Sequence, residues 1–277
     1  MKAVGCILII MTCLLCSCLE DTTRTPNFVV EGFIVAGEPV NNIKIKQISS
    51  LLSEEVTSES ITDARVVIEH GSDAFPLLFN STTGLYEYVE SDLNIEIAEE
   101  YRLTVDVGDR LASATTLVPD RPTGLSLTGN QLVIPTLRLS FQLRQEITDL
   151  FQEERITLTW DEVEGQSFFV VIENRVAELD PILPEQIPEE AIELLSSFRF
   201  ISEPSTTGSF DIIGVALETY GPHVAKVFTV NEEYVDLFNS LEQDSRDLNE
   251  PPSNVSQALG IFTAFAVDSL EFEVVRE

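Results

Sequence analysis

Short runs of alternating hydrophobic and polar residues dominate the chain from residue 28 onward. Residues 28–35 read Phe-Val-Val-Glu-Gly-Phe-Ile-Val, a run rich in β-branched and aromatic side chains, and residues 42–46 alternate strictly. Such runs, separated by turn residues at a spacing of about 8–12 positions, are typical of strands in a β-sandwich. The pattern predicts strands over 28–35, 42–46, 64–69, 77–79, 85–89, 101–107 and 111–117.

A proline-containing segment, Val118 to Gly124, interrupts this pattern. Pro119 and Pro122 lack the N–H group that a strand ladder needs, so the segment is predicted to be an extended linker. The sequence therefore predicts a mainly β fold with two β-sandwich-like domains of the immunoglobulin or fibronectin type, over 28–118 and 125–277. The strands predicted in the second domain are 137–143, 155–160, 167–173 (the hairpin partner of 155–160), 260–267 and 270–274.

Two segments of the second domain have helical rather than β patterns. The insertion at 178–204 contains Pro188-Glu189-Glu190, which is typical of the first turn of a helix. A second helix is predicted to start after Asn231, a good N-cap residue. Its apolar residues recur at helical spacing and predict a face docked on a sheet, with partner binding as the alternative. These residues are Tyr234, Leu237, Phe238 and Leu241.

The N-terminus is typical of an exported lipoprotein. Residues 1–17 combine Lys2 with an apolar run from Ala3 to Leu15, which predicts a signal peptide because the run is too short to span a bilayer. Leu15-Cys16-Ser17-Cys18 resembles the bacterial lipobox, so Cys18 is predicted to be lipidated and to hold the protein on a membrane. An ordinary exported thiol is the alternative. Residues 18–27 are predicted to form a tether, and no cysteine follows Cys18 to form a disulfide.

Acidic residues outnumber basic ones by 47 to 16, which gives a formal charge of −31. Nucleic-acid binding is therefore not expected, because it needs clustered Lys and Arg. The acidity is interpreted as a solubility feature, with steering of a cationic partner as the alternative. Glu20-Asp21 resembles the surface-export signal of Bacteroidota lipoproteins, whereas an ordinary polar tether would face the periplasm.

Several motifs occur in an order that resembles the DUF4249 family of Bacteroidota lipoproteins. The N-terminal ones are Val29-Val30-Glu31-Gly32-Phe33-Ile34, Ile61-Thr62-Asp63-Ala64-Arg65-Val66, Gly84-Leu85-Tyr86 and Tyr101-Arg102-Leu103-Thr104-Val105. The C-terminal ones are Val230-Asn231-Glu232-Glu233-Tyr234, Pro251-Pro252-Ser253-Asn254-Val255 and Ala258-Leu259-Gly260-Ile261-Phe262. The resemblance implies an outer-membrane lipoprotein, often encoded beside TonB-dependent receptors, with two β-rich domains and no established reaction.

Motifs for catalysis are sparse. His70 and His223 lie far apart, and the sequence has no His-Glu-x-x-His, Gly-x-Ser-x-Gly or phosphate-binding glycine loop. No cofactor or metal is therefore predicted, although Asp244, Asp247 and Glu250 form a weak candidate for calcium. A carboxylate pair of the glycosidase type stays open as an alternative because acids are so abundant.

The sequence leads to an expectation of a lipid-anchored outer-membrane accessory or binding protein, without catalysis, that partners a TonB-dependent transporter. The alternative is a surface protein that binds a glycan or peptide, with Phe198, Phe200 and Tyr220 as candidate ligand-binding aromatics. A carboxylate-dependent hydrolase is a third hypothesis. Trp160, the single tryptophan, is interpreted as a core residue rather than a stacking platform.

Overall fold

The computed structural model describes residues 28–48, 59–135, 155–176, 178–182, 199–214, 217–241 and 252–277. Within them the fold is mainly β, as predicted, with one helix, α4 (Glu232–Leu241). The first strands are β1 (Phe28–Val35), β2 (Ile43–Gln47), β3 (Arg65–His70), β4 (Asp73–Asn80), β5 (Leu85–Glu87), β6 (Glu100–Val107) and β7 (Arg110–Leu117). The others are β8 (Ser126–Leu127), β9 (Gln131–Ile134), β10 (Arg155–Thr159), β11 (Ser167–Asn174), β12 (Arg199–Ile201), β13 (Ser209–Ile213), β14 (Gly221–Val230) and β15 (Leu259–Arg276).

Several predictions fall outside the described residues. These are the signal peptide, Cys18 and the tether, the strand at 137–143, the calcium candidates, and most of the insertion at 178–204. The described end of that insertion is a strand, β12, which pairs with β11. Residues 118–125, between β7 and β8, form no strand or helix, whereas their role as a linker and the division into two domains stay predictions.

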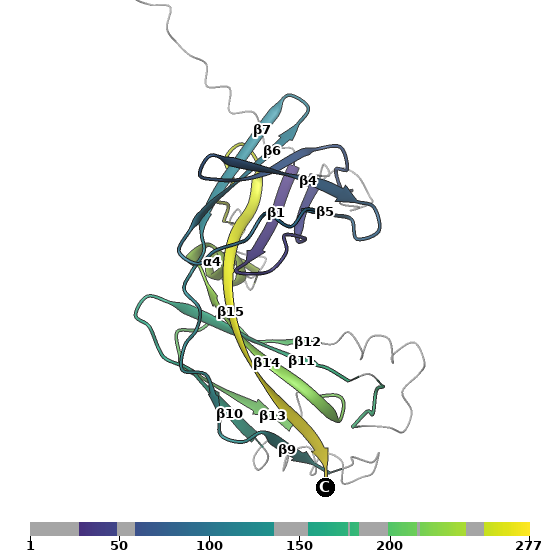
Figure 1. Ribbon diagram of the computed structural model, residues 1–277, viewed down its shortest axis with the longest axis vertical. Helices are drawn as coiled ribbons and strands as arrows, with labels where there is room; N and C mark the ends of the chain where they lie inside the picture. The colour runs from purple at the N-terminus through teal and green to yellow at the C-terminus, as the bar shows by residue number, and fades with distance from the viewer. Residues whose placement is uncertain are drawn as a thin grey trace, which may run out of the picture.

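The strand β15 runs through both halves of the molecule (Figure 1). Its first residues pair in parallel with β1, from Leu259 opposite Val29 to Phe265 opposite Val35. From Phe265 onward it pairs antiparallel with β14, and its last residues pair in parallel with β9. The sequence predicted two closing strands here, but the structure has one strand of 18 residues. Through it, twelve of the described strands, from both halves, form one sheet, in the order β12-β11-β14-β15-β1-β2-β5-β4-β3-β6-β7 with β9 beside β15. The strands β13, β10 and β8 form a second, smaller sheet.

The first core lies in the N-terminal half, between β1, β2 and β5 on one side and β3, β6 and β7 on the other. Strand β4 connects the two groups because it pairs with β3 and, further along, with β5. Phe262 and Ala264 of β15 are fully buried in this core together with Phe28 and Val30 of β1. The C-terminal strand is therefore part of the N-terminal core.

Two tyrosines fasten loops to the first core. The hydroxyl of Tyr86 accepts a hydrogen bond from the backbone N–H of Ala64 and donates one to the carbonyl of Ile61, at 3.0 and 2.9 Å. The hydroxyl of Tyr101 similarly bonds Glu96 N–H and the carbonyl of Asn94. Both rings are buried, so each hydroxyl satisfies backbone groups that would otherwise lose their water partners.

A glycine lets β15 approach β1 closely, and an amide side chain bonds backbone groups near the start of β15. Gly260 has φ of +114°, and a Cβ atom there would lie 1.9 Å from the carbonyl oxygen of Val30. The side chain of Asn254 donates to the carbonyl of Phe262 at 2.7 Å and accepts from its N–H at 2.9 Å. Asn254 thus supplies to Phe262 the hydrogen bonds that a neighbouring strand would supply, because the pairing of β14 with β15 begins only at Phe265.

The second core lies between the small sheet β13-β10-β8 and the strands β11, β14, β15 and β9. Trp160 is 7% exposed and contacts the ring of Phe168, which confirms its prediction as a core residue. The predicted hairpin of 155–160 with 167–173 is wrong: β10 pairs with β13 and β8, whereas β11 pairs with β12 and β14. The two strands face each other across the core instead of lying side by side.

A third hydrophobic cluster, the junction cluster, lies where the two halves meet. The rings of Phe169, Phe265 and Phe33 surround Tyr234 of α4, with centroid separations of 5.4, 5.1 and 6.5 Å. Val235 of the same helix also packs there. The helix docks on a sheet as predicted and contacts strands from both halves, but of the predicted face only Tyr234 is in this cluster, together with Val235. The side chain of Leu241 lies outside the description.

Candidate functional site

The structure places two of the three predicted ligand-binding aromatics in or against the second core. Phe200 on β12 is half-buried and contacts the ring of Phe210 at 5.6 Å. Tyr220 is 5% exposed, and the guanidinium of Arg276 lies 4.5 Å from its ring centre. Phe198 lies outside the described residues. Phe200 and Tyr220 share one core rather than one open surface, and their role in ligand binding stays a prediction.

The two histidines occupy separate structural positions. His70 at the end of β3 stacks on Tyr101 and contacts Glu99 at 3.2 Å. His223 is 3% exposed, and its Nδ1 lies 2.9 Å from the carbonyl of Gly221. Burial holds the pKa of His223 below its ordinary value, since the protonated ring would lose its hydration. Across the described ranges, no three Asp, Glu, His or Cys residues come together as a metal site.

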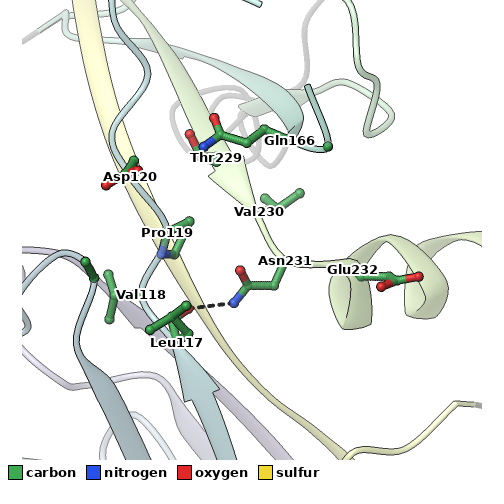
Figure 2. Close-up of a pocket in the computed structure, with 11 residues that line it drawn as sticks. Leu117, Val118, Pro119, Asp120, Gln166, Thr229, Val230, Asn231 and Glu232 are labelled. Atoms are coloured by element: carbon green, nitrogen blue, oxygen red, sulfur yellow. Dashed lines mark hydrogen bonds between the residues drawn. The ribbon is translucent and has the colours of Figure 1, made fainter. Parts of the chain in front are cut away.

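A pocket of about 290 Å³ lies at the junction of the two halves. We call it the junction pocket. Figure 2 shows the chain after β7 on one side and the connection from β14 to α4 on the other. The lining also includes residues from the turns before β6 and before β11. The residues that line it are Ala98, Leu117, Val118, Pro119, Asp120, Gly165, Gln166, Thr229, Val230, Asn231 and Glu232.

Hydrogen bonds fasten one wall of this pocket to the other. The amide nitrogen of Asn231 donates to the carbonyl of Leu117 at 2.9 Å (Figure 2). It also donates to the hydroxyl of Thr116 at 3.1 Å. The Thr116 hydroxyl donates in turn to a carboxylate oxygen of Glu233 at 3.2 Å. The carbonyl of Asn231 accepts the N–H of Tyr234 and so begins α4 where the sequence predicted. Asn231 therefore joins β7 to the first turn of the helix.

The interior of the pocket offers polar groups suited to binding. The hydroxyl of Thr229 is buried and has no hydrogen-bond partner, although an isolated buried hydroxyl is costly. Figure 2 shows Thr229 and Gln166 at the end of the pocket opposite Leu117. Asp120 and Glu232 are exposed at its rim. The arrangement can hold a small hydroxyl- or amide-bearing molecule through hydrogen bonds.

Sequence reasoning missed this pocket because its lining comes from four separate turns and strand ends. None of these segments carries a periodic pattern or a catalytic motif. The segment Val230 to Tyr234 was the one available signal, because it belongs to a motif on which the family resemblance rests. Its Asn231 proves to be the residue that closes the junction.

Asn231→Ala is expected to destabilise the protein by about 1–2 kcal/mol, because it removes the hydrogen bonds of the amide to Thr116, Leu117 and Glu233 and leaves the Leu117 carbonyl without this partner. Urea unfolding monitored by circular dichroism measures the change. Asn239→Ala is the matched control, since Asn239 is exposed on the same helix and should change stability by less than about 0.5 kcal/mol. Equal effects of the two substitutions would show that Asn231 does not fasten the junction.

The described residues contain no helix with the length and apolar character needed to cross a membrane. No curated protein matches the chain. Among solved structures, domains A168–A170 of titin match with 11% identity and a TM-score of 0.21. The match covers 89% of this chain and 62% of the titin fragment.

A family model described as a domain of unknown function, DUF4249, matches residues 19–271. The match takes in both cores, the junction pocket and most of the shared strand β15. It includes the motif residues whose roles are described above: Tyr86 and Tyr101 in the first core, Asn231 at the junction, and Asn254 and Gly260 beside β15. The chain belongs to the DUF4249 family.

Proposed function

We propose that this protein is a non-catalytic lipoprotein of the outer membrane that acts as an accessory or binding subunit beside a TonB-dependent transporter. The observation that carries the proposal is the shared strand β15, which joins both cores into one elongated body (Figure 1). A body of this kind suits a protein that presents a surface at a distance from its anchor.

The parallel pairing of β1 and β15 indicates which core would lie nearer the membrane. Phe28, at the start of β1, lies near Leu259, at the start of β15, because Val29 pairs with Leu259. The other end of β15 is about 60 Å away, at roughly 3.3 Å for each of its 18 residues. A lipid on Cys18 would therefore hold the first core nearest the membrane and the second core outermost.

Physical considerations favour tethering as the mechanism. Several acyl chains on one cysteine contribute roughly 0.8 kcal/mol for each buried CH₂ group, enough for a stable anchor. The formal charge of −31 opposes contact of the polypeptide with anionic headgroups. A tethered protein has a high effective concentration near its receptor, so a modest affinity is sufficient for association.

Cys18→Ala is expected to release the protein from the membrane fraction, because the substitution removes the thiol that carries the acyl chains. Fractionation of cells followed by immunoblotting measures the share of protein that stays with the membrane. Cys16→Ala is the control, since Cys16 lies in the predicted signal peptide and its loss should leave the protein membrane-bound. Retention of the Cys18→Ala protein in membranes would contradict the anchor.

The proposed transporter partner is tested separately in detergent-solubilised membranes. The wild-type protein should co-purify with a TonB-dependent transporter that mass spectrometry identifies. The Cys18→Ala protein should recover much less of it, because the effective concentration from the shared membrane is lost. If the anchored protein co-purifies with no transporter, the accessory role is wrong even where the anchor is correct.

A second candidate function, binding of a glycan or peptide, draws support from the junction pocket. The unpartnered hydroxyl of Thr229 and the nearby Gln166 offer hydrogen bonds to a hydroxyl or amide group. Calorimetric screening of oligosaccharides and short peptides tests this function. Failure of every such ligand to bind would leave the accessory role as the proposal.

A further inference from the structure

Three cationic side chains surround a single carboxylate on the outer strands of the second half. Lys226 Nζ lies 2.9 Å from Glu173 Oε2, Arg175 Nη2 lies 3.5 Å from the same oxygen, and Arg199 Nε lies 3.7 Å from Oε1. Glu173 is on β11, Lys226 on β14 and Arg199 on β12, so three adjacent strands and the residue after β11 position them. We call this group the cation cluster.

The composition of the cluster is unusual for this chain. The whole sequence has 16 basic residues against 47 acidic ones, yet here three basic residues meet one acid. Glu271 on β15, opposite Val224, lies on the same face of the sheet and is the diagonal cross-strand neighbour of Lys226. Such neighbours are about 7–8 Å apart, and no ion pair joins Glu271 to the cluster among the described residues. The four side chains of the cluster together carry a formal charge of +2, and β12 is the edge strand of the sheet among the described residues.

Burial separates the members of the cluster into two groups. The side chains of Glu173 and Lys226 are 15% and 22% exposed, so they form the floor. The side chains of Arg175 and Arg199 are 55% and 66% exposed. Their distances to Glu173 exceed the usual 2.7–2.9 Å of a charge-assisted hydrogen bond. Glu173 therefore reduces the repulsion among the three cations. It forms no bidentate salt bridge with Arg175 or Arg199.

An apolar side chain lies beside the cluster. Ile201 is two residues after Arg199 on β12, so both project from the same face of the strand. Ile201 is 55% exposed although it is a large hydrophobic residue. A charged group and an apolar contact are thus available within one short strand.

We propose that Arg175, Arg199 and Lys226 form a binding site for an organic anion. The guanidinium groups bind its carboxylate or phosphate group, because Arg presents N–H donors in a geometry that matches these oxyanions. Ile201 contacts the apolar part of the ligand. The site is separate from the membrane anchor and from the junction pocket, and it does not depend on the proposed function.

Calorimetric titration of the purified full-length protein at low ionic strength tests this site. Hexyl phosphate and hexanoate are the probes for the two oxyanions, and inorganic phosphate is the probe without an apolar part. The wild-type protein should bind one or both organic probes saturably and inorganic phosphate at least tenfold more weakly. Which organic probe binds more tightly identifies the oxyanion as phosphate or carboxylate. Affinity should fall as salt is added, because counterions screen the exposed guanidiniums.

Substitutions locate the site. Arg199→Gln and Lys226→Gln should each weaken binding of the organic probe at least tenfold, and Ile201→Ser should weaken it while leaving phosphate unaffected. Arg155→Gln is the matched control, since Arg155 is a similarly exposed arginine paired with Asp211 on the small sheet. Circular dichroism verifies that each variant is folded. Absence of saturable binding to the wild-type protein, or equal loss in the Arg155→Gln protein, would overturn the proposal.

Discussion

Gly260→Ala is expected to destabilise the protein by more than about 4 kcal/mol and to prevent folding of the first core. The new Cβ atom would lie 1.9 Å from the carbonyl oxygen of Val30 and 2.8 Å from its backbone nitrogen. These are backbone atoms of β1 at the register position paired with Gly260, so no side-chain rotation relieves the overlap. The φ of +114° adds strain for any residue with a Cβ atom.

A second glycine distinguishes the overlap of the new Cβ atom with β1 from the backbone strain at positive φ. Gly71, in the turn between β3 and β4, has φ of +60°, but no atom lies within 4 Å of the position that a Cβ atom would take there. Gly71→Ala therefore carries the backbone strain alone and should cost about 1–2 kcal/mol. Urea unfolding followed by circular dichroism compares the two variants. If they lose similar stability, close packing of β15 against β1 is not what requires glycine at position 260.

Tyr86→Phe is expected to cost about 2–3 kcal/mol, the second largest effect. The substitution keeps the buried ring but leaves the Ala64 N–H and the Ile61 carbonyl without the hydroxyl that serves both. Burial raises the pKa of Tyr86, so the hydroxyl keeps its proton and continues to donate to Ile61 at mildly alkaline pH. Thermal and urea unfolding measure the change.

Tyr88→Phe is the matched control for this substitution. Its hydroxyl donates to the exposed carboxylate of Asp92, and that hydrogen bond raises the pKa of Tyr88 to about 12. Because water can replace this partner, the loss should stay below about 1 kcal/mol. A loss as large as that of Tyr86→Phe would mean that the loop attachment at Ile61 and Ala64 is unimportant for stability.

The first half follows its sequence pattern closely for a physical reason. Strands such as β1 have one face in the core and the other more open, so buried and partly exposed residues alternate along them. The predicted strand 28–35 coincides with β1. The strand β14, which the pattern did not reveal, is buried on both faces between the second core and the junction cluster. It lacks the alternation on which the prediction depended.

Long-range pairing explains the other differences. Nearby strands commonly form hairpins, yet β10 and β11 belong to opposite sheets, and local sequence does not contain that information. The two predicted strands 260–267 and 270–274 leave out the polar residues Asp268 and Ser269. In the structure β14 pairs with β15 continuously across both residues, so the strand does not break.

The candidate sites were less predictable than the fold. Phe200 and Tyr220 were chosen for their aromatic character, and that same character places them against the second core. The junction pocket and the cation cluster both depend on residues from different strands. Arg175, Arg199 and Lys226 come together only through the pairing of β12, β11 and β14. The spacing of these residues along the chain therefore does not predict the cation cluster.

The pairing of β1 with β15 also bears on how the chain reaches its folded state. Val29 pairs with Leu259, which comes 230 positions later. The N-terminal half therefore cannot complete its sheet before β15 has been synthesised. Contacts between such distant residues form late and slow folding, because a long loop must close first. The N-terminal half is thus expected to stay incompletely folded until β15 has been synthesised and can pair with β1.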